Sequence, residues 1–169
     1  MKIAETQRLT IEKAVLNDAH FFLKLLNSPN WITFIGNRNI NSEEDARNYI
    51  EHSLISSYTK NGYGLYKVSL KENSKPIGIC GFVKRDYLDS ADIGFAILPK
   101  YENQGYTLEA SKAMLKYGKT ELNLNPILGI TTRKNIRSQG LLKKIGLKEI
   151  GKISPDKDVT QFLLFSTEF

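Results

Sequence analysis

The chain has 169 residues, 41% of them hydrophobic, which is enough for a packed core and too many for a disordered chain. Its formal net charge of +6 fits an acidic partner, a phosphorylated cofactor or simple solubility. The lysines are spread along the chain without a basic block or a nucleic-acid-binding motif, so we expect no nucleic-acid partner. We expect a single domain over residues 1–169.

The sequence carries no sign of export or of membrane insertion. No apolar run approaches the roughly 20 residues that span a bilayer, and residues 1–13 alternate polar and apolar positions instead of forming a signal-peptide core. The single cysteine, Cys80, has no partner for an internal disulfide or a metal site, and its apolar surroundings predict a small buried core residue. We therefore expect a cytoplasmic protein with no metal and no membrane association.

The pattern of apolar residues and turn signals predicts a mixed α/β (α+β) protein. The second expected helix carries a near-capping box, in which Ser42 precedes Asp45 by three positions. Short polar turns join the three middle strands, which indicates an antiparallel meander. In chain order we expect a strand at residues 6–11, a helix from 17 or 18 to a stop at Pro29, a loop at 31–40, a helix from 41 to about 58, strands at 63–70, 76–84 and 91–98, a helix at 105–119, a strand at 127–132, a helix at 136–144, and strands at 147–153 and 160–165.

Residues 93–110 form the most informative stretch. An apolar strand ends at Pro99, a polar turn follows, and a helix then begins near Gly105. The first turn of a helix leaves backbone N–H groups unpaired, and a phosphate binds well there. The stretch lacks the spacing of a P-loop or of a dinucleotide fingerprint. From these residues alone, an anion site and an ordinary strand-to-helix connection both stay open.

Residues 95–110 resemble the acetyl-CoA pyrophosphate loop of the GNAT superfamily, in particular of its ribosomal-protein (RimJ/RimL type) N-acetyltransferase branch. Two positions depart from the pattern: Asn103 replaces the first loop glycine, and Thr107 replaces a small alanine. Asparagine tolerates a left-handed backbone better than most residues, so the loop is still expected to form. Other stretches match the family in the same order along the chain: Thr6-x-Arg8-Leu9, Phe34-Ile35-Gly36, Gly62-x-Gly64-Leu65-Tyr66, Pro76-Ile77-Gly78 and Asn135-x-x-Ser138.

The resemblance implies a central, mostly antiparallel twisted sheet of about seven strands, flanked by about four helices. It also implies that the fourth strand, ending at Leu98, splays from the fifth at residues 127–132, with acetyl-CoA between them. Backbone contacts to pantetheine are expected at Ala96, Ile97 and Leu98. The pyrophosphate is expected on the N–H groups of Gln104, Gly105, Tyr106 and Thr107. Asn135 would hold the pantetheine amides, cap the helix at residues 136–144, or do both.

For catalysis, the resemblance implies that Ser138 lies near the thioester sulfur, although a helix-surface serine is an equal alternative. An attacking amine must lose a proton, and Asp92 on the central strand is the first candidate for the general base. The alternatives are Asp86, Asp89 and Glu109, the last of which is also explained by its place in the first turn of a helix. His20 and His52 have no partner that would make them catalytic, and we interpret both as structural.

For the acceptor, we expect Trp31, Phe34 and Tyr66 to shape a pocket, with core packing as the alternative for all three. The implied function is transfer of the acetyl group of acetyl-CoA to a primary amine, on a protein N-terminus or on a small molecule. A GNAT-like module that binds acyl-CoA with little or no transfer is the alternative, and a basic RNA-associated protein is a third hypothesis based on charge alone. The oligomeric state stays open, with a homodimer among the alternatives.

Overall fold

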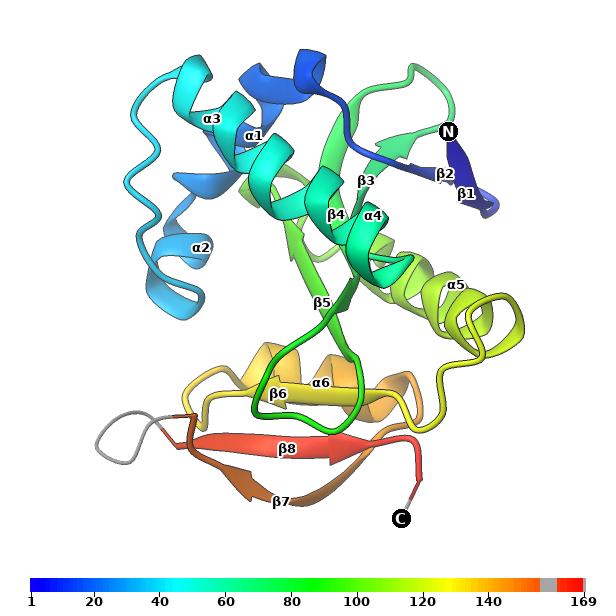
Figure 1. The fold of residues 1–169 in the computed structure, drawn as a ribbon. Helices are drawn as coiled ribbons and strands as arrows, with labels where there is room; N and C mark the ends of the chain where they lie inside the picture. Colours follow the sequence, from blue (N-terminus) through cyan, green and yellow to red (C-terminus); the bar gives the residue numbers. More distant parts are fainter. Residues whose placement is uncertain (156–160, 169) are drawn as a thin grey trace.

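The computed structural model describes residues 1–155 and 161–168, and their strands form one open sheet (Figure 1). The eight strands of this described part follow the order β1-β2-β3-β4-β5-β6-β8-β7. Their bounds are β1 (Lys2–Glu5), β2 (Leu9–Glu12), β3 (Leu65–Leu70), β4 (Pro76–Val83), β5 (Asp92–Ile97), β6 (Leu128–Thr131), β7 (Lys148–Ile153) and β8 (Phe162–Ser166). The expected strand at 160–165 is thus β8, and Thr160 itself lies outside the described residues.

All neighbouring strands pair antiparallel except β5 and β6, which run parallel. The parallel pair is joined at a single register position, Asp92 opposite Leu128. The two strands diverge beyond that point, so the expected splay and the expected meander of β3, β4 and β5 are confirmed. The sheet has one strand more than expected, because residues 2–12 form a hairpin in which the Thr6 N–H donates to the Leu9 carbonyl at 2.9 Å.

Most helices lie over the half of the sheet that contains β1–β5, and one helix packs against β6 (Figure 1). They are α1 (Ala19–Leu26), α2 (Pro29–Phe34), α3 (Glu43–Tyr49), a π-helical segment η2 (Ile50–Ile55), α4 (Ser56–Asn61), α5 (Tyr106–Thr120) and α6 (Ile136–Lys144). Two short 3₁₀ turns, η1 (Leu16–Asp18) and η3 (Pro99–Tyr101), precede α1 and follow β5.

One helix was not expected. Pro29 ends α1 as predicted, but it also begins α2, so residues 31–34 are helical and not part of a loop. Proline suits the first position of a helix because its missing N–H would have no partner there and its φ is already helical. This short helix carries Trp31 and Phe34.

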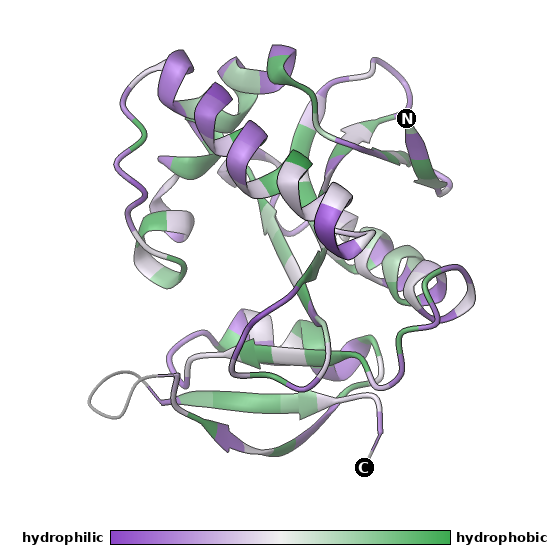
Figure 2. Ribbon diagram, in the orientation of Figure 1, coloured by the Kyte–Doolittle hydropathy of each residue, from purple (hydrophilic) through white to green (hydrophobic). Residues whose placement is uncertain are grey.

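The elements α3, η2 and α4 form one continuous helical run, as expected for residues 41–58. The predicted capping box is present: the Asp45 N–H donates to Ser42 Oγ at 3.1 Å, and the Ser42 N–H donates to Asp45 Oδ2 at 3.0 Å. The run ends at Gly62, whose φ of +77° is the left-handed conformation that the Asn61-Gly62 turn signal predicts. Figure 2 shows hydrophilic residues along the outer side of this run.

The core lies between the sheet and these helices, where the strands are mostly hydrophobic in Figure 2. On one side, α5 packs against β4 and β5. Cys80 is buried there as predicted, with its Sγ 3.6 Å from the Ser111 hydroxyl, and burial raises the pKa of its thiol to about 12. Within the described part of the chain, no helix combines the length and apolar composition needed to cross a bilayer.

Candidate active site

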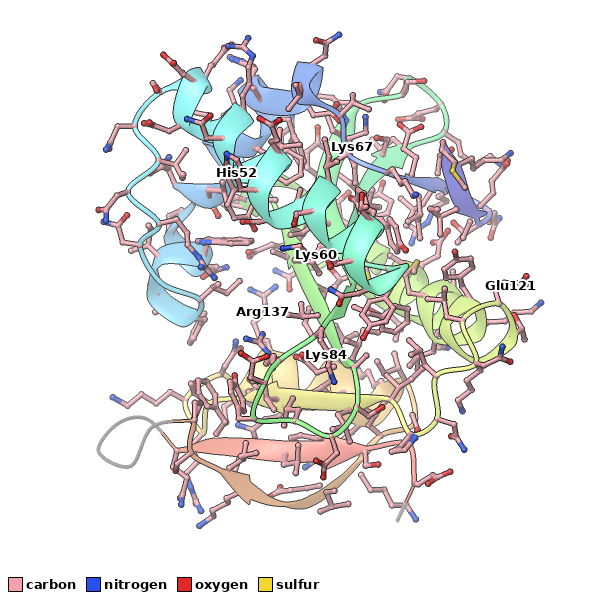
Figure 3. All side chains as sticks on the ribbon, viewed as in Figure 1. His52, Lys60, Lys67, Lys84, Glu121 and Arg137 are labelled. Carbon is pink, nitrogen blue, oxygen red and sulfur yellow. The ribbon has the colours of Figure 1, made fainter. Side chains whose placement is uncertain are left out.

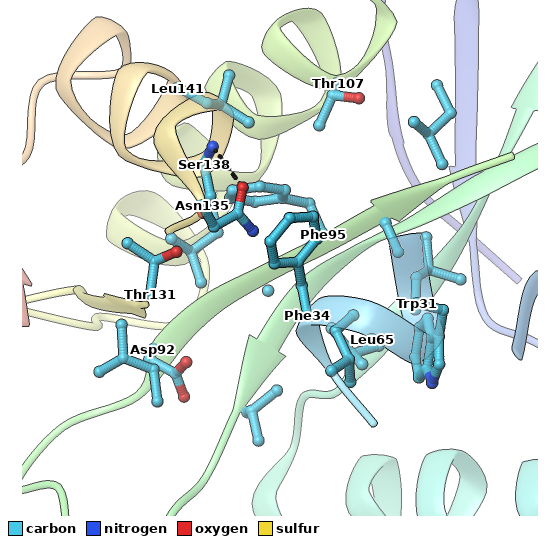
Figure 4. A pocket seen from close by; sticks show the side chains of 18 of the residues that line it. Trp31, Phe34, Leu65, Asp92, Phe95, Thr107, Thr131, Asn135, Ser138 and Leu141 are labelled. Carbon is cyan, nitrogen blue, oxygen red and sulfur yellow. Dashed lines mark hydrogen bonds between the residues drawn. The ribbon is translucent and has the colours of Figure 1, made fainter. Parts of the chain in front are cut away.

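A cavity of about 1150 Å³ opens where β5 and β6 diverge (Figure 4). It is bounded by the turn between β5 and α5, the start of α6, α2, α4 and the loop after β4. A volume of this size exceeds the usual range for sites that hold one drug-sized ligand. The cavity is therefore large enough for two ligands that meet inside it.

The first wall of the cavity is the backbone of β5. In an antiparallel pair, every second residue of a strand directs its N–H and C=O away from the partner. The Leu98 N–H donates to the Ile77 carbonyl of the β4 side at 2.8 Å, and this fixes the alternation. Residues with the opposite parity, Phe95 and Ile97, therefore direct their backbone groups toward the gap with β6.

This geometry corrects two of the three expected backbone contacts. Leu98 is wrong, because the Ile77 carbonyl takes its N–H and the Tyr101 N–H donates to its carbonyl at 2.9 Å. Ala96 lines the cavity, but its backbone groups have the parity that faces β4. The error arose because the family motif fixes the segment but not which residues face the gap. Ile97 keeps the expected orientation, and Phe95 takes the place of the other two.

The second wall is the turn that leads into α5. Asn103 and Gly105 adopt φ values of +60° and +78°, as the left-handed tolerance of asparagine and glycine allows. The backbone N–H groups of residues 103–108 donate to no acceptor in the part of the chain that the structure describes. A row of free N–H groups at a helix N-terminus attracts a phosphate, so this turn has the properties of an anion site.

A clamp holds this turn from behind. Glu109, in the first turn of α5, accepts hydrogen bonds from Thr6 Oγ1 at 2.6 Å and from the Arg8 backbone N–H at 2.9 Å, and pairs with Arg8 Nε at 2.7 Å. Arg8 also donates to the Gln104 carbonyl at 3.0 Å and lies 4.3 Å above the Tyr106 ring. Burial alone would raise the pKa of the Glu109 carboxyl, but these hydrogen bonds outweigh burial and lower it.

The clamp decides two predictions. Glu109 does not line the cavity, so its role here is structural and it is not the base. Gln104 is not among the lining residues, and its side chain donates back to the Lys100 carbonyl at 3.0 Å, but the predicted contact involves its backbone N–H and stays a prediction. Of the expected loop residues, Gly105, Tyr106 and Thr107 do line it.

Asn135 and Ser138 come from the start of α6 (Figure 4). Asn135 caps the helix as predicted, because its Oδ1 accepts the Ser138 N–H at 3.2 Å. Its amide nitrogen stays available on the cavity side, next to Phe95. The capping hydrogen bond involves the backbone N–H of Ser138, so it leaves the Ser138 hydroxyl available to a ligand.

Asp92 lies where β5 and β6 join, at the closed end of the gap. The residue is 1% exposed, and its Oδ1 accepts a hydrogen bond from Arg85 Nε at 2.9 Å. Burial raises the pKa of the Asp92 carboxyl to about 6, although Arg85 acts in the opposite direction. The two other aspartates considered as bases, Asp86 and Asp89, are exposed and do not line the cavity.

Two of the three aromatic residues proposed for the acceptor pocket line the cavity. Trp31 and Phe34 line the cavity from α2. Tyr66 does not: it is fully buried, with its ring stacked on Tyr58 at 5.3 Å and edge-on to Tyr117 at 6.3 Å. Successive strand residues point to opposite faces, so Leu65 lines the cavity in its place.

The remaining predictions concern the two histidines, neither of which lines the cavity. His20 Nδ1 lies 2.9 Å from Glu43 on the surface, which fits the structural interpretation. Several further residues reach the cavity from separate segments, and no local sequence pattern marks them. These residues are Arg38, Tyr49, Lys60, Leu65, Lys84, Arg85 and Arg137.

Comparisons with known proteins agree with this arrangement. Residues 8–148 match the acetyltransferase (GNAT) domain family. The chain is 30% identical over 146 residues to the uncharacterised N-acetyltransferase YnaD of Bacillus subtilis (strain 168), covering 86% of this chain and 82% of that protein. It superposes on a GNAT-family acetyltransferase from Bacillus anthracis with a TM-score of 0.79 and 26% identity, over 98% of this chain and 97% of that one.

The fold also matches RimL, a ribosomal L7/L12 alpha-N-protein acetyltransferase solved in complex with coenzyme A. The TM-score is 0.84 at 14% identity, over 98% of this chain and 97% of that one. This likeness concerns the fold, including the mixed sheet and the helices around it.

Proposed function

This chain belongs to the acetyltransferase (GNAT) domain family and is an N-acetyltransferase, and we propose that the cavity between β5 and β6 is its active site. One observation carries the proposal. The free N–H groups of Asn103 and of residues 105–108 and the unpaired backbone of Phe95 and Ile97 lie along the same cavity. A ligand with a pyrophosphate at one end and amides along its length satisfies both.

The residues present fit acetyl-CoA, which GNAT acetyltransferases use. Its pyrophosphate would bind the N–H groups of Gly105, Tyr106 and Thr107, where the helix dipole favours negative charge. Its pantetheine amides would pair with Phe95, Ile97 and the free amide nitrogen of Asn135, so that the ligand replaces the missing part of the β5–β6 ladder. Asn103 supports this assignment, because its left-handed backbone takes the conformation that a glycine would supply.

When bound, acetyl-CoA supplies a thioester whose acetyl carbon accepts an amine. Asp92 accepts the proton that the amine must lose, and a carboxyl with a pKa of about 6 is ionised at neutral pH. The nitrogen–carbon bond forms, the carbon–sulfur bond breaks, and Ser138 donates a proton to the departing sulfur. Solvent takes the proton from Asp92 and returns one to Ser138, so each product carries its full complement of hydrogens.

Calorimetric titration with acetyl-CoA tests the assignment of the cavity. We expect one site per chain and, at about 100 times the dissociation constant, a gain of roughly 2.7 kcal/mol in stability. Thr107→Trp, which would fill the cavity at the turn, should abolish the binding. Lys112→Gln on the outer face of α5 is the matched control and should bind normally. Lack of any heat or melting shift at millimolar acetyl-CoA would contradict the proposal.

Release of free thiol in the presence of an amine panel separates an enzyme from a module that only binds acyl-CoA. We expect thiol release that depends on both the amine and the protein. Binding of acetyl-CoA without amine-dependent release would favour the binding module.

A further inference from the structure

The charges around the cavity are strongly unequal. Seven cationic side chains line it against two carboxylates. The cations are Arg38, Lys60, Lys84, Arg85, Lys134, Arg137 and Lys144, and the carboxylates are Asp92 and Glu102. Both carboxylates are already paired, Asp92 with Arg85 and Glu102 with Arg137.

These cations divide between the two ends of β5. Arg137 belongs to the α5 end, because it donates to Glu102 at 2.9 Å and to the Asn103 side chain at 3.0 Å. Lys84 belongs to the other end, because it follows Val83, which is the register partner of Asp92. A strand rises about 3.3 Å per residue, so the six residues of β5 separate the two ends by about 17 Å.

Lys60 also belongs to the Asp92 end. It lies in the last turn of α4, and the chain then turns at Gly62 into β3. The chain enters β3 near the closed end of the gap, because the Phe82 N–H donates to the Gly64 carbonyl and Phe82 pairs with Ile93, the neighbour of Asp92. In the view of Figure 3, Lys60, Arg137 and Lys84 all lie in the central part of the molecule, between α4 and the loop after β4.

Neither lysine is used within the protein. The side chains of Lys60 and Lys84 make no ion pair or hydrogen bond with any residue that the structure describes. By contrast, Lys67 pairs with Asp18 at 2.8 Å and Glu12 at 3.1 Å, so a lysine on this side of the sheet can find an internal partner. The N–H groups proposed for the acetyl-CoA phosphates lie at the Ile97 end, about 17 Å from Asp92 along β5, which leaves Lys84 at the Asp92 end for another anion.

We propose that the acceptor amine carries an anionic group, a carboxylate or a phosphate, which binds between Lys60 and Lys84 while the amine faces Asp92. This proposal rests on the proposed function and specifies the acceptor of that reaction. The amine and the anion then find opposite charges at the closed end of the cavity. Lys60 and Lys84 are exposed at the mouth of the cavity, whereas Asp92 is buried, so the anion would stay near solvent while the amine reaches inward.

Matched acceptor pairs test the proposal and distinguish the two anions. The pairs are β-alanine with β-alaninamide, for a carboxylate, and O-phosphoethanolamine with ethanolamine, for a phosphate. Initial rates are measured at saturating acetyl-CoA. We expect kcat/KM to be at least about tenfold higher for the anionic member of one pair, which corresponds to about 1.4 kcal/mol. Equal values in both pairs would overturn the proposal.

Charge removal at the two lysines gives the second arm. Lys60→Gln and Lys84→Gln should each raise KM for the preferred anionic amine about tenfold, with kcat and the acetyl-CoA dissociation constant unchanged. The KM for its neutral counterpart should stay the same. Lys112→Gln removes the same charge outside the cavity and should change neither value. An equal effect of all three substitutions would assign the result to overall charge and overturn the proposal.

Binding without turnover gives a third readout that does not depend on catalysis. O-Phosphoethanolamine and β-alanine are titrated into the protein saturated with coenzyme A. Binding of one of them that is lost in the Lys60→Gln, Lys84→Gln double variant supports the proposal, and binding of neither overturns it. Failure of the proposed function looks different, because acetyl-CoA itself would then fail to bind or no amine would release thiol.

Discussion

The two ends of β5 present different kinds of groups to the cavity. At the Ile97 end they are mainly backbone N–H and C=O groups, held in place by the clamp of Arg8 and Glu109. At the Asp92 end they are side chains from α4 and the loop after β4. A backbone site tolerates many side-chain changes, whereas a side-chain site changes with each one. The first end is therefore suited to one constant ligand and the second to selecting an acceptor.

The sharpest test of this comparison is Asp92→Asn at the side-chain end. We expect turnover to fall by about 10² to 10⁴, the usual contribution of a general base, with acetyl-CoA affinity unchanged. In the wild type, log(kcat/KM) should rise with pH up to about 6 and then level off, because Asp92 must be ionised to accept a proton. A variant with full turnover at saturating acceptor would remove Asp92 from the mechanism.

Ionisation of Asp92 should raise activity but lower the stability of the folded protein. The folded pKa of Asp92 lies above its ordinary 3.8, so the folded state binds this proton more tightly than the unfolded state does. Wild-type stability should therefore fall as pH rises from about 4 to about 6 through this group, and Asp92→Asn should lack that fall. Chemical unfolding at pH 4.5 and pH 7.5 measures both. Equal pH dependence in the two proteins would contradict the raised pKa.

Ser138→Ala tests whether Ser138 contributes to the chemical step without contributing to acetyl-CoA binding. A group that acts on the departing sulfur contributes in the transition state and not to ground-state binding. We expect turnover to fall about 10²-fold while the acetyl-CoA dissociation constant stays nearly constant. Helix α6 should keep its stability, because Asn135 caps the Ser138 backbone N–H, which the substitution leaves in place. Unchanged turnover would make Ser138 an ordinary helix residue.

Asn135→Ala is expected to have a smaller effect on rate but to act on two properties together. It removes a helix cap, which costs about 1 kcal/mol of stability. It also removes the side-chain amide available to pantetheine, so acetyl-CoA should bind more weakly by about tenfold. Calorimetry and denaturant unfolding measure the two effects on one sample. Asn135→Ser, which retains a capping oxygen, should restore stability without restoring affinity.

Asn103→Gly should have the smallest effect, because the turn would bind its ligand through backbone N–H groups and the substitution removes only a side chain. Glycine relieves the left-handed strain at φ +60°, and the change loses one hydrogen bond from the exposed Arg137. We expect stability and acetyl-CoA affinity to stay within about 0.5 kcal/mol of the wild type. A large loss of affinity would show that the asparagine side chain contacts the ligand.

The sequence predicted most of the architecture and the backbone end of the site. The antiparallel meander, the capping box at Ser42 and the left-handed Asn103 all follow from local patterns. Helix α2 was missed because Pro29 can both end one helix and begin the next. Leu98 and Tyr66 were misplaced because a family motif locates a strand but does not fix which neighbour faces the gap.

The side-chain end could not be predicted in the same way. Lys60 and Lys84 lie far apart in the sequence, and only the tertiary fold brings them to one cavity. Both lysines are exposed, so neither burial nor sequence pattern distinguishes them from other surface lysines. Their lack of internal partners became visible only in the folded chain.

The burial of Cys80 has a practical consequence for measuring this enzyme. Thiol reagents attack the thiolate, and a thiol with a pKa of about 12 that is 1% exposed will not react in the native protein. Because it is the only cysteine of the chain, a chromogenic thiol assay will report coenzyme A alone, without background from the folded enzyme. Slow labelling of Cys80 in the absence of substrates will instead time the transient opening of the core, so one reagent measures both turnover and conformational stability.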